Sequence, residues 1–263
     1  MTKKITIGVT DLSFHRVAAS LLGHIIERFG FEVERVYSPH EQNFEKLKQG
    51  DVGLLASAWL PSSHGGYKAE VEKTVPLIEL GLHYEPYALW GVPEYIPASE
   101  VNTVEDLKKP SVSLKMVKKI QGINQGAGIS RFSQSIVKHY HLNDLGYEFF
   151  TGTEEDCFTT FEQNVAGSKW FVVPLWKPQF LHYKHNIREL TEPEGLLGTV
   201  DKAVLLMRKD VSEMFSQEQL ATLDSLRFGN QVIAELDYKV CRENLDVDAV
   251  TLQWLKENSH YLG

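Results

Sequence analysis

Residues 4–60 read KITIGVTDLSFHRVAASLLGHIIERFGFEVERVYSPHEQNFEKLKQGDVGLLASAWL, and this stretch decides the fold. Its apolar spacing predicts strands over 4–9, 31–37 and 52–60, with helices over 14–29 and 40–49 between them. Gly30 and Gly50 fall where the two helices are expected to end, and Ser13 stands where the first is expected to be N-capped. A β-α-β-α-β order with short connections predicts an open α/β sheet.

The same order recurs farther along the chain. Strands are predicted over 120–123, 147–150 and 170–176, and helices over 130–140 and 154–165. Two such α/β units predict two lobes, residues 1–88 plus 205–263 and residues 89–204, joined through segments 84–97 and 203–211. Because ligands of α/β proteins bind beyond the carboxyl ends of strands, we expect a central ligand cleft between the lobes.

Composition excludes several classes of protein. The chain has 263 residues, of which 43% are hydrophobic and 24% charged, as in an ordinary folded domain. A net charge of −8 argues against a partner that is nucleic acid or anionic lipid. Cys157 and Cys241 make no disulfide scaffold or metal motif, and we expect two ordinary thiols.

Targeting signals are also missing from the pattern. No apolar run reaches the roughly 18–20 residues that a membrane span needs. The apolar run Ile5–Val9 is shorter than the roughly 7–15 residues at the centre of a signal peptide. The sequence therefore indicates either a cytoplasmic protein or the mature form of an exported one.

Several fragments resemble catalytic or metal sites but lack essential parts. GAGISR (126–131) has no third glycine for a dinucleotide fingerprint, and HGGY (64–67) has no accompanying GxSxG elbow. The pairs His182/His185 and His139/His141 lack a third ligand. We therefore expect no catalytic residue, no cofactor and no metal, while an enzyme or a ligand-sensing module on the same fold stays the alternative.

The aromatic residues favour a binding site. Trp59 and Trp176 each end a predicted strand, each is followed closely by proline, and each belongs to a different lobe. Two indole faces suit a quaternary ammonium group, which has no N–H to donate. His64 follows Trp59, and GAGI (126–129) enters a helix whose first N–H groups favour an anion. A cation end and a carboxylate end together describe a betaine.

Longer motifs then point to a family. SAWLPSSHGGY (57–67), GINQGAGIS (122–130), VPLWKPQF (173–180) and WLKEN (254–258) resemble the glycine betaine/proline betaine-binding proteins of bacterial ABC importers. The resemblance implies a two-lobed, type II periplasmic-binding-protein-like α/β fold and an extracytoplasmic receptor. It also implies a betaine-type ligand and an ABC permease as partners.

The resemblance assigns roles residue by residue. Trp59 and Trp176 match two of the three tryptophans that enclose the ammonium group in the family, and His64 matches the histidine that binds the carboxylate. Gly128 and Ile129 match the residues whose backbone amides bind the same carboxylate.

One wall of the ammonium site departs from the family pattern. Leu12 stands where the third tryptophan is expected, and either Phe14 or Trp90 is available to replace it. Losing one indole costs about 1–2 kcal/mol of cation–π attraction unless another ring compensates. Arg16 is a candidate for a second anion contact, although a solvated surface arginine is the simpler expectation. Glycine betaine, proline betaine, carnitine, choline-derived acids and a sulfonium acid all stay open as ligands.

Overall fold

The computed structural model describes residues 3–262 and divides the chain into two compact units. Unit 1 contains the chain up to Pro86, the short segment Pro178–Tyr183, and the chain from Asp201 onward; unit 2 contains Tyr87–Lys177 and Lys184–Val200. The sequence placed the boundaries at residues 88/89 and 204/205, and it did not separate 178–183 from the second lobe.

Unit 1 is built on one mixed sheet with the strand order β2-β1-β3-β10-β4. Its strands are β1 (Lys4–Thr10), β2 (Glu32–Ser38), β3 (Leu54–Leu60), β4 (Leu77–Tyr84) and β10 (Lys202–Arg208). β1 pairs in parallel with β2 and β3, whereas β10 runs antiparallel to β3 and β4. Every residue of β3 is buried, which explains why its sequence is apolar except for Ser57. The open α/β sheet predicted from residues 4–60 is confirmed.

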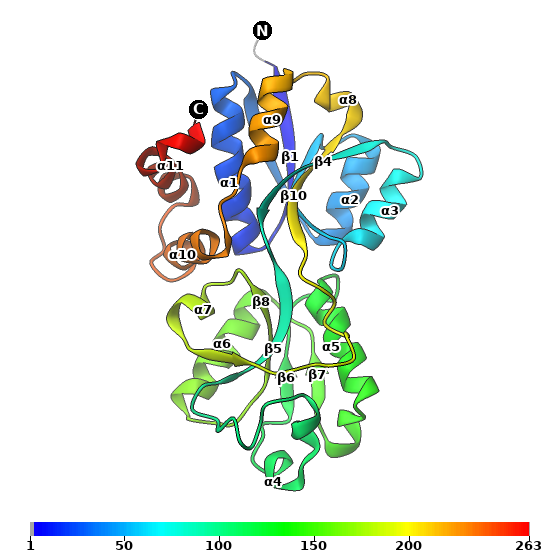
Figure 1. The fold of residues 1–263 in the computed structure, drawn as a ribbon, viewed down its shortest axis with the longest axis vertical. Coiled ribbons are helices and arrows are strands. Elements are labelled where there is room, and N and C mark those ends of the chain that lie inside the picture. The colour runs from blue at the N-terminus through cyan, green and yellow to red at the C-terminus, as the bar shows by residue number, and fades with distance from the viewer. Residues whose placement is uncertain (1–2, 263) are drawn as a thin grey trace. The chain divides into compact units, whose positions relative to one another are not determined.

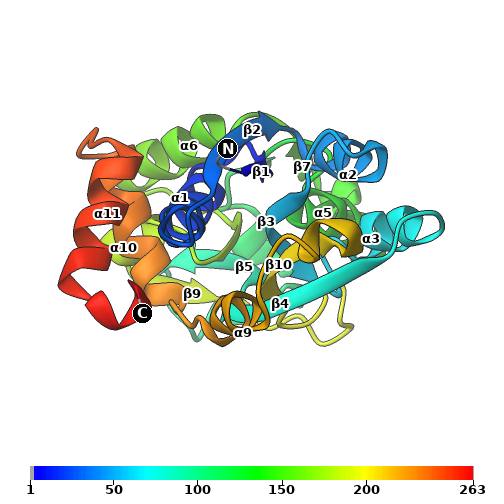
Figure 2. The same ribbon diagram turned by 90° about the horizontal axis from the view of Figure 1, so that it is seen from above.

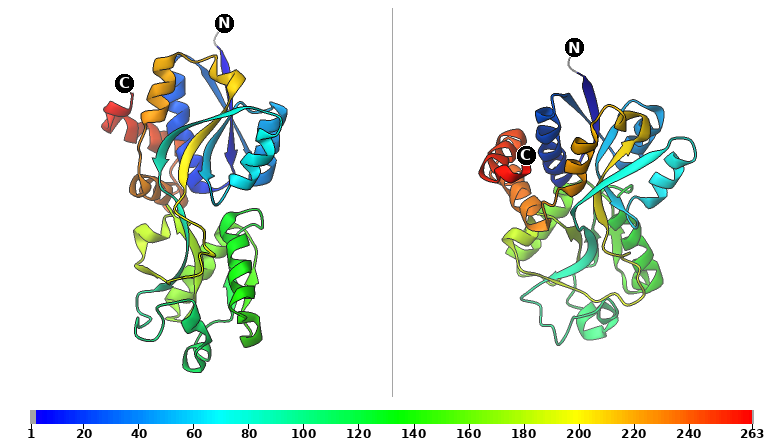
Figure 3. Two further views of the ribbon diagram at one scale, coloured as in Figure 1. Left: turned by 45° about the vertical axis from the view of Figure 1, so that its right-hand side comes forward. Right: turned by 45° about the horizontal axis from the view of Figure 1, so that its top comes forward.

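Helices cover both faces of this sheet. They are α1 (Ser13–Arg28), α2 (His40–Gln49), α3 (Gly65–Glu72), α8 (Lys209–Ser212), α9 (Gln217–Ser225), α10 (Asn230–Cys241), α11 (Val247–Glu257) and the 3-10 turn η3 (Ser259–Leu262). Figures 1 and 2 show α1, α10 and α11 on one side of the sheet and α2 with α3 on the other. Both views of Figure 3 show α10 and α11 packed beside α1.

Two details of unit 1 differ from the sequence expectation. Leu12, in an extended conformation, is the N-cap of α1, and Ser13 is the first helical residue, so the prediction of Ser13 as N-cap is wrong. Residues 203–211 were expected to join the lobes, but most of them form β10, which is held between β3 and β4 by backbone pairing on both edges.

Unit 2 carries smaller sheets. Its strands are β5 (Tyr87–Pro93), β6 (Lys119–Gln121), β7 (Glu148–Phe150), β8 (Val173–Lys177) and β9 (Ile187–Glu189), and its helices are η1 (Glu105–Lys108), α4 (Pro110–Ser113), α5 (Gly128–His139), η2 (Leu142–Leu145) and α6 (Glu154–Ala166). β5 lies between β8 and β9, and β6 pairs in parallel with β7. A capping box formed by Thr153 and Asp156 begins α6. The elements predicted over 120–176 are thereby confirmed.

Residues Pro178–Tyr183 belong to unit 1 because they pack on α10. The backbone N–H of Phe180 donates to Asp237 Oδ2 at 3.3 Å, and the Phe180 ring lies 6.4 Å from that of Tyr238 and 4.5 Å from the Arg242 guanidinium carbon. Short helix α7 (Leu181–Lys184) follows. Across the described residues 3–262, no helix has the length and apolar character needed to cross a membrane.

Candidate functional site

Trp59 is the penultimate residue of β3, and the loop that follows it is fixed by a buried carboxylate. Asp201 accepts hydrogen bonds from the backbone N–H groups of Ser62 (2.6 Å) and Ser63 (2.9 Å). The proline at position 61 ends the strand, as expected from its lack of a backbone N–H. The loop thus returns His64 beside Trp59.

His64 is held to Trp59 by two hydrogen bonds. The backbone N–H of Trp59 donates to His64 Nδ1 at 2.9 Å, and the backbone N–H of His64 donates to the Trp59 carbonyl at 2.8 Å. The two rings are stacked with an interplanar angle of 23° and centroids 6.2 Å apart. Because a backbone N–H only donates, Nδ1 must be the acceptor and the proton of a neutral His64 sits on Nε2. The structure therefore presents His64 as an N–H donor without requiring a positive charge.

The structure also brings Phe14 to this group. Its ring lies 5.2 Å from the ring of Trp59, and Phe14 is buried in the first turn of α1. Leu12, the aliphatic residue at the expected third tryptophan, is only 6% exposed as the N-cap of the same helix. An aromatic ring two residues farther on thus stands beside Trp59.

Two hydroxyl groups connect Trp59 to the interior of unit 1. Trp59 Nε1 donates to Tyr84 Oη at 3.0 Å, and Tyr84 Oη lies 2.5 Å from Ser57 Oγ. Burial raises the pKa of Tyr84 to about 12, so its hydroxyl keeps its proton at neutral pH. The Trp59 indole is therefore anchored at its nitrogen.

Three buried histidines meet beside Trp59: His15 of α1, His40 of α2 and His64. One ring nitrogen of each lies within 4.8 Å of the others. The pKa of His15 is well below 6.5, first because of burial and second because of neighbouring His40. Sequence reasoning missed His15 and His40 as site residues, because they are 25 and 24 residues from their next partners and match no short ligand motif.

The cavity next to this cluster is small. It is lined by Thr10, Asn43, Ser57 and His64, among others, and measures about 10 Å³, which is about the volume a single water needs. It is far too small for a betaine, so we do not place the ligand inside it.

Unit 2 contains the other candidate residues. Trp176 is the penultimate residue of β8, where it pairs with Ala88 of β5 and packs 6.1 Å from the Phe158 ring. Gly128 and Ile129 are the first two residues of α5, and no side chain caps this helix. The first N–H groups of a helix have no partner within the helix and carry partial positive charge. Unit 2 therefore supplies an indole and two backbone donors.

Trp90 and Arg16, which were also named from the sequence, already donate hydrogen bonds within the protein. Trp90 is fully buried in unit 2, and its Nε1 donates to Ser133 Oγ of α5 at 2.8 Å. Arg16 Nε donates to Asp11 at 2.9 Å, and its guanidinium carbon lies 5.1 Å from the centre of the Tyr37 ring. Arg16 is half-exposed, as the simpler expectation had it.

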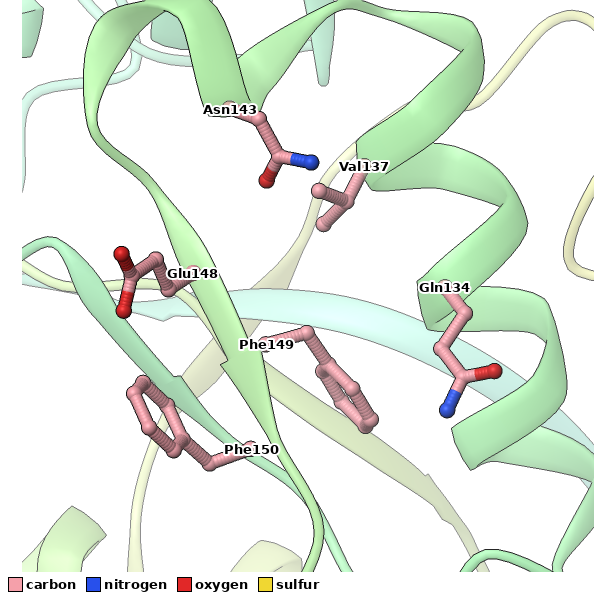
Figure 4. Close-up of a pocket in the computed structure, with 6 residues that line it drawn as sticks. All are labelled: Gln134, Val137, Asn143, Glu148, Phe149 and Phe150. Carbon is pink, nitrogen blue, oxygen red and sulfur yellow. The ribbon is translucent and has the colours of Figure 1, made fainter.

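A shallow groove elsewhere on unit 2 does not contain any predicted site residue. Figure 4 shows its lining, with Phe149 and Phe150 on β7 and Gln134 and Val137 on α5. Phe150 is 41% exposed, and the Lys119 ammonium lies 5.2 Å from the centre of its ring. An occupied aromatic face of this kind offers little to a second cation, so we do not place the candidate site in this groove.

Comparison with known proteins now adds a family match. Residues 3–257 match the family model OpuAC, described as the substrate binding domain of ABC-type glycine betaine transport system. The glycine betaine/carnitine transport binding protein GbuC of Listeria monocytogenes is 24% identical over 139 residues, which is 53% of this chain and 46% of that protein. The matched region thus spans about half the length of this curated relative.

Solved structures are similar over nearly the whole chain. Lactococcal OpuAC, in a closed conformation complexed with glycine betaine, matches with a TM-score of 0.85 and 20% identity, covering 99% of this chain and 98% of that one. The glycine betaine/L-proline-binding protein ProX of Borrelia burgdorferi matches with a TM-score of 0.86 and 21% identity, covering 99% and 95%. At these identities the likeness establishes the fold, and the type II periplasmic-binding-protein-like α/β class is confirmed.

Proposed function

This chain belongs to the family of substrate-binding domains of ABC-type glycine betaine transport systems, and from that premise we propose that it binds a small carboxylated quaternary ammonium compound. The observation that carries the proposal is the joining of Trp59, an aromatic wall, to His64, a fixed N–H donor, by two backbone-anchored hydrogen bonds. One end of such a pair suits a methylated ammonium group and the other a carboxylate.

The cation end depends on aromatic faces. Trp59 is held in place through Nε1 by Tyr84, and Phe14 lies beside it. A quaternary ammonium group placed against a desolvated indole gains about 2 kcal/mol. We propose that Trp176 of unit 2 supplies a second indole. We also propose that the Phe14 ring partly replaces the third tryptophan of the family, in whose place this chain has Leu12.

The anion end depends on N–H donors. His64 directs Nε2–H away from the backbone that holds Nδ1, and the N–H groups of Gly128 and Ile129 begin α5. Hydrogen bonds to a carboxylate are about twice as strong as those between neutral groups. We propose that these donors contact the carboxylate of the same ligand.

The proposed role is that of a non-catalytic receptor outside the cytoplasm, which delivers its ligand to the membrane permease of an ABC importer. Support for this role comes from the family, whose described task is substrate binding for such a transport system. Binding without reaction also agrees with a site made of indoles, backbone amides and neutral imidazole.

Isothermal titration calorimetry with glycine betaine, proline betaine, carnitine and choline tests the proposal. We expect saturable one-to-one binding of at least one carboxylated member of the set, stronger than that of choline. Absence of heat and of a thermal shift with all four compounds would overturn the ligand assignment.

A further inference from the structure

A chain of hydrogen bonds runs through unit 1 from Trp59 to His15. Trp59 Nε1 lies 3.0 Å from Tyr84 Oη, Tyr84 Oη lies 2.5 Å from Ser57 Oγ, and Ser57 Oγ lies 3.4 Å from His15 Nδ1. An indole nitrogen only donates, so Tyr84 Oη accepts from it. For the buried proton of Tyr84, Ser57 Oγ is the acceptor within reach in the described part of the chain. The Ser57 hydroxyl then has its own O–H to donate, and His15 Nδ1 lies 3.4 Å from Oγ as its acceptor.

This direction fixes the tautomer of His15. With Nδ1 accepting from Ser57, the ring proton of a neutral His15 sits on Nε2. His64 has the same tautomer for a separate reason, because its Nδ1 accepts the backbone N–H of Trp59. Two independent hydrogen-bond arrangements thus turn two buried imidazoles into Nε2–H donors.

The two rings lie close enough to serve one small group. Their centroids are 6.1 Å apart with an interplanar angle of 32°, and both side chains are buried. The His40 ring lies 5.1 Å from that of His64. Burial first, and neighbouring His40 second, lower the pKa of His15, which favours a neutral His15 with its Nδ1 lone pair available to Ser57. A carboxylate has two oxygens and so accepts from two such donors.

The same tautomers disfavour a metal ion, although three histidines in a group invite that interpretation. A neutral imidazole binds zinc through its unprotonated nitrogen. In His64 that nitrogen already accepts the Trp59 N–H, and in His15 it faces Ser57. His15 and His64 therefore present N–H groups that donate hydrogen bonds, rather than lone pairs that bind a metal ion.

We propose that His15 is a second hydrogen-bond donor to the ligand's carboxylate, acting beside His64 and oriented by the chain Trp59–Tyr84–Ser57. The proposal rests on the proposed function, because it concerns the anion end of the same site. It makes Trp59 serve both ends of the ligand, as an aromatic wall for the cation and as the start of the chain that orients an anion donor.

Nitrogen-15 NMR of the ligand-free protein tests the tautomers before any ligand is added. We expect Nε2-protonated signals from both His15 and His64, assigned by comparison with His15→Gln and His64→Gln. Adding glycine betaine is expected to move the His15 Nε2–H signal downfield. An Nδ1-protonated His15, or a His15 signal that glycine betaine leaves in place while it binds, would overturn the proposal.

Calorimetry with glycine betaine gives the energetic test. We expect His15→Leu to weaken binding at least about tenfold, the cost of one hydrogen bond to a charged group. His15→Gln, which keeps an amide N–H near the position of Nε2, should stay within about threefold of the wild type. His83→Gln changes another buried histidine of unit 1, whose Nε2 lies 3.1 Å from the Leu223 carbonyl, and should leave affinity unchanged.

The outcomes separate the two proposals. Wild-type protein that gives no heat with glycine betaine, proline betaine, carnitine or choline overturns the proposed function, and this inference with it. Wild-type binding that His15→Leu leaves intact overturns the inference alone. If the wild type binds Zn²⁺ tightly and both His15→Leu and His64→Ala abolish this binding, the Nε2 atoms of the two histidines carry lone pairs rather than protons. That result would overturn the inference. Should His15→Leu not fold, His15→Gln and the NMR shift decide.

Discussion

The two units differ in what they bury. Unit 1 encloses all the buried histidines and aspartates of residues 3–262: His15, His40, His64, His83, Asp201 and Asp237. The polar side chains buried in unit 2 are uncharged amides and hydroxyls: Gln121, Ser130, Ser133 and Asn164. Of the residues proposed to bind the ligand, those of unit 1 include side chains oriented by hydrogen bonds, whereas those of unit 2 are one indole and a helix N-terminus. Changes of pH should therefore act mainly through the buried histidines and aspartates of unit 1.

Trp59→Ala should have the largest effect. It removes the aromatic wall, worth about 2 kcal/mol or about 30-fold in affinity, and the donor to Tyr84. It also truncates a buried indole, at a cost of roughly 3 kcal/mol in the free energy of unfolding. Calorimetry and urea denaturation measure the two losses.

The matched comparison is Trp176→Ala in unit 2. We expect a similar loss of affinity without any change in the tautomer of His15, because Trp176 has no part in the hydrogen-bond chain. The variant Trp59→Phe keeps an aromatic ring but has no Nε1–H to donate to Tyr84. It therefore distinguishes the loss of the aromatic wall from the loss of this hydrogen bond. Wild-type affinity in either alanine variant would show that the indole concerned is a packing residue.

Asp237 gives the next effect, on pH dependence. Burial raises its pKa to about 6 from 3.8, so the native state favours its protonated form. Its contribution to stability is full below about pH 3.8 and is lost as the pH rises through about 6. Between pH 4.5 and 7 we expect the free energy of unfolding of the wild type, relative to Asp237→Asn, to fall by about 2 kcal/mol.

Urea denaturation of both proteins at several pH values measures this difference. His83 acts in the opposite sense, because burial lowers its pKa to about 4 and its contribution is lost as the pH falls through that value. His83→Gln is therefore the control for direction. A wild-type-to-Asp237→Asn difference that stays constant from pH 4.5 to 7 would contradict the assignment.

Trp90→Phe should have the smallest effect, and we expect that effect in the free energy of unfolding and not in ligand affinity. The variant leaves Ser133 Oγ without the indole donor, at a cost of about 1 kcal/mol. Ligand affinity should stay within about twofold of the wild type, and Ser133→Ala should cost a similar amount of stability. A tenfold loss of affinity in Trp90→Phe would instead make Trp90 the replacement for the missing third tryptophan.

The sequence predicted what depends on local pattern. Apolar spacing located the strands and helices of residues 4–60, and the motif around Trp59 and His64 led to a pair that the structure joins by hydrogen bonds. The position of residues 178–183 was not predictable in this way, because it depends on contacts with Asp237 and Tyr238, more than fifty residues away.

The residues of the hydrogen-bond chain that begins at Trp59 could not be predicted from the sequence for the same reason. Ser57 and Tyr84 lie on two strands that are not neighbours in the sheet, and His15 lies on a helix before both. None of the three has a spacing that marks it in the sequence. Only the fold brings a hydroxyl, a phenol and an imidazole into one directed chain.

A crystal structure of the chain with glycine betaine tests the central claim most directly. We predict the carboxylate within hydrogen-bond distance of Nε2 of His64 and His15 and of the N–H groups of Gly128 and Ile129. The trimethylammonium group should contact the rings of Trp59 and Trp176. A carboxylate bound away from His64, or an ammonium group away from Trp59, would contradict the account.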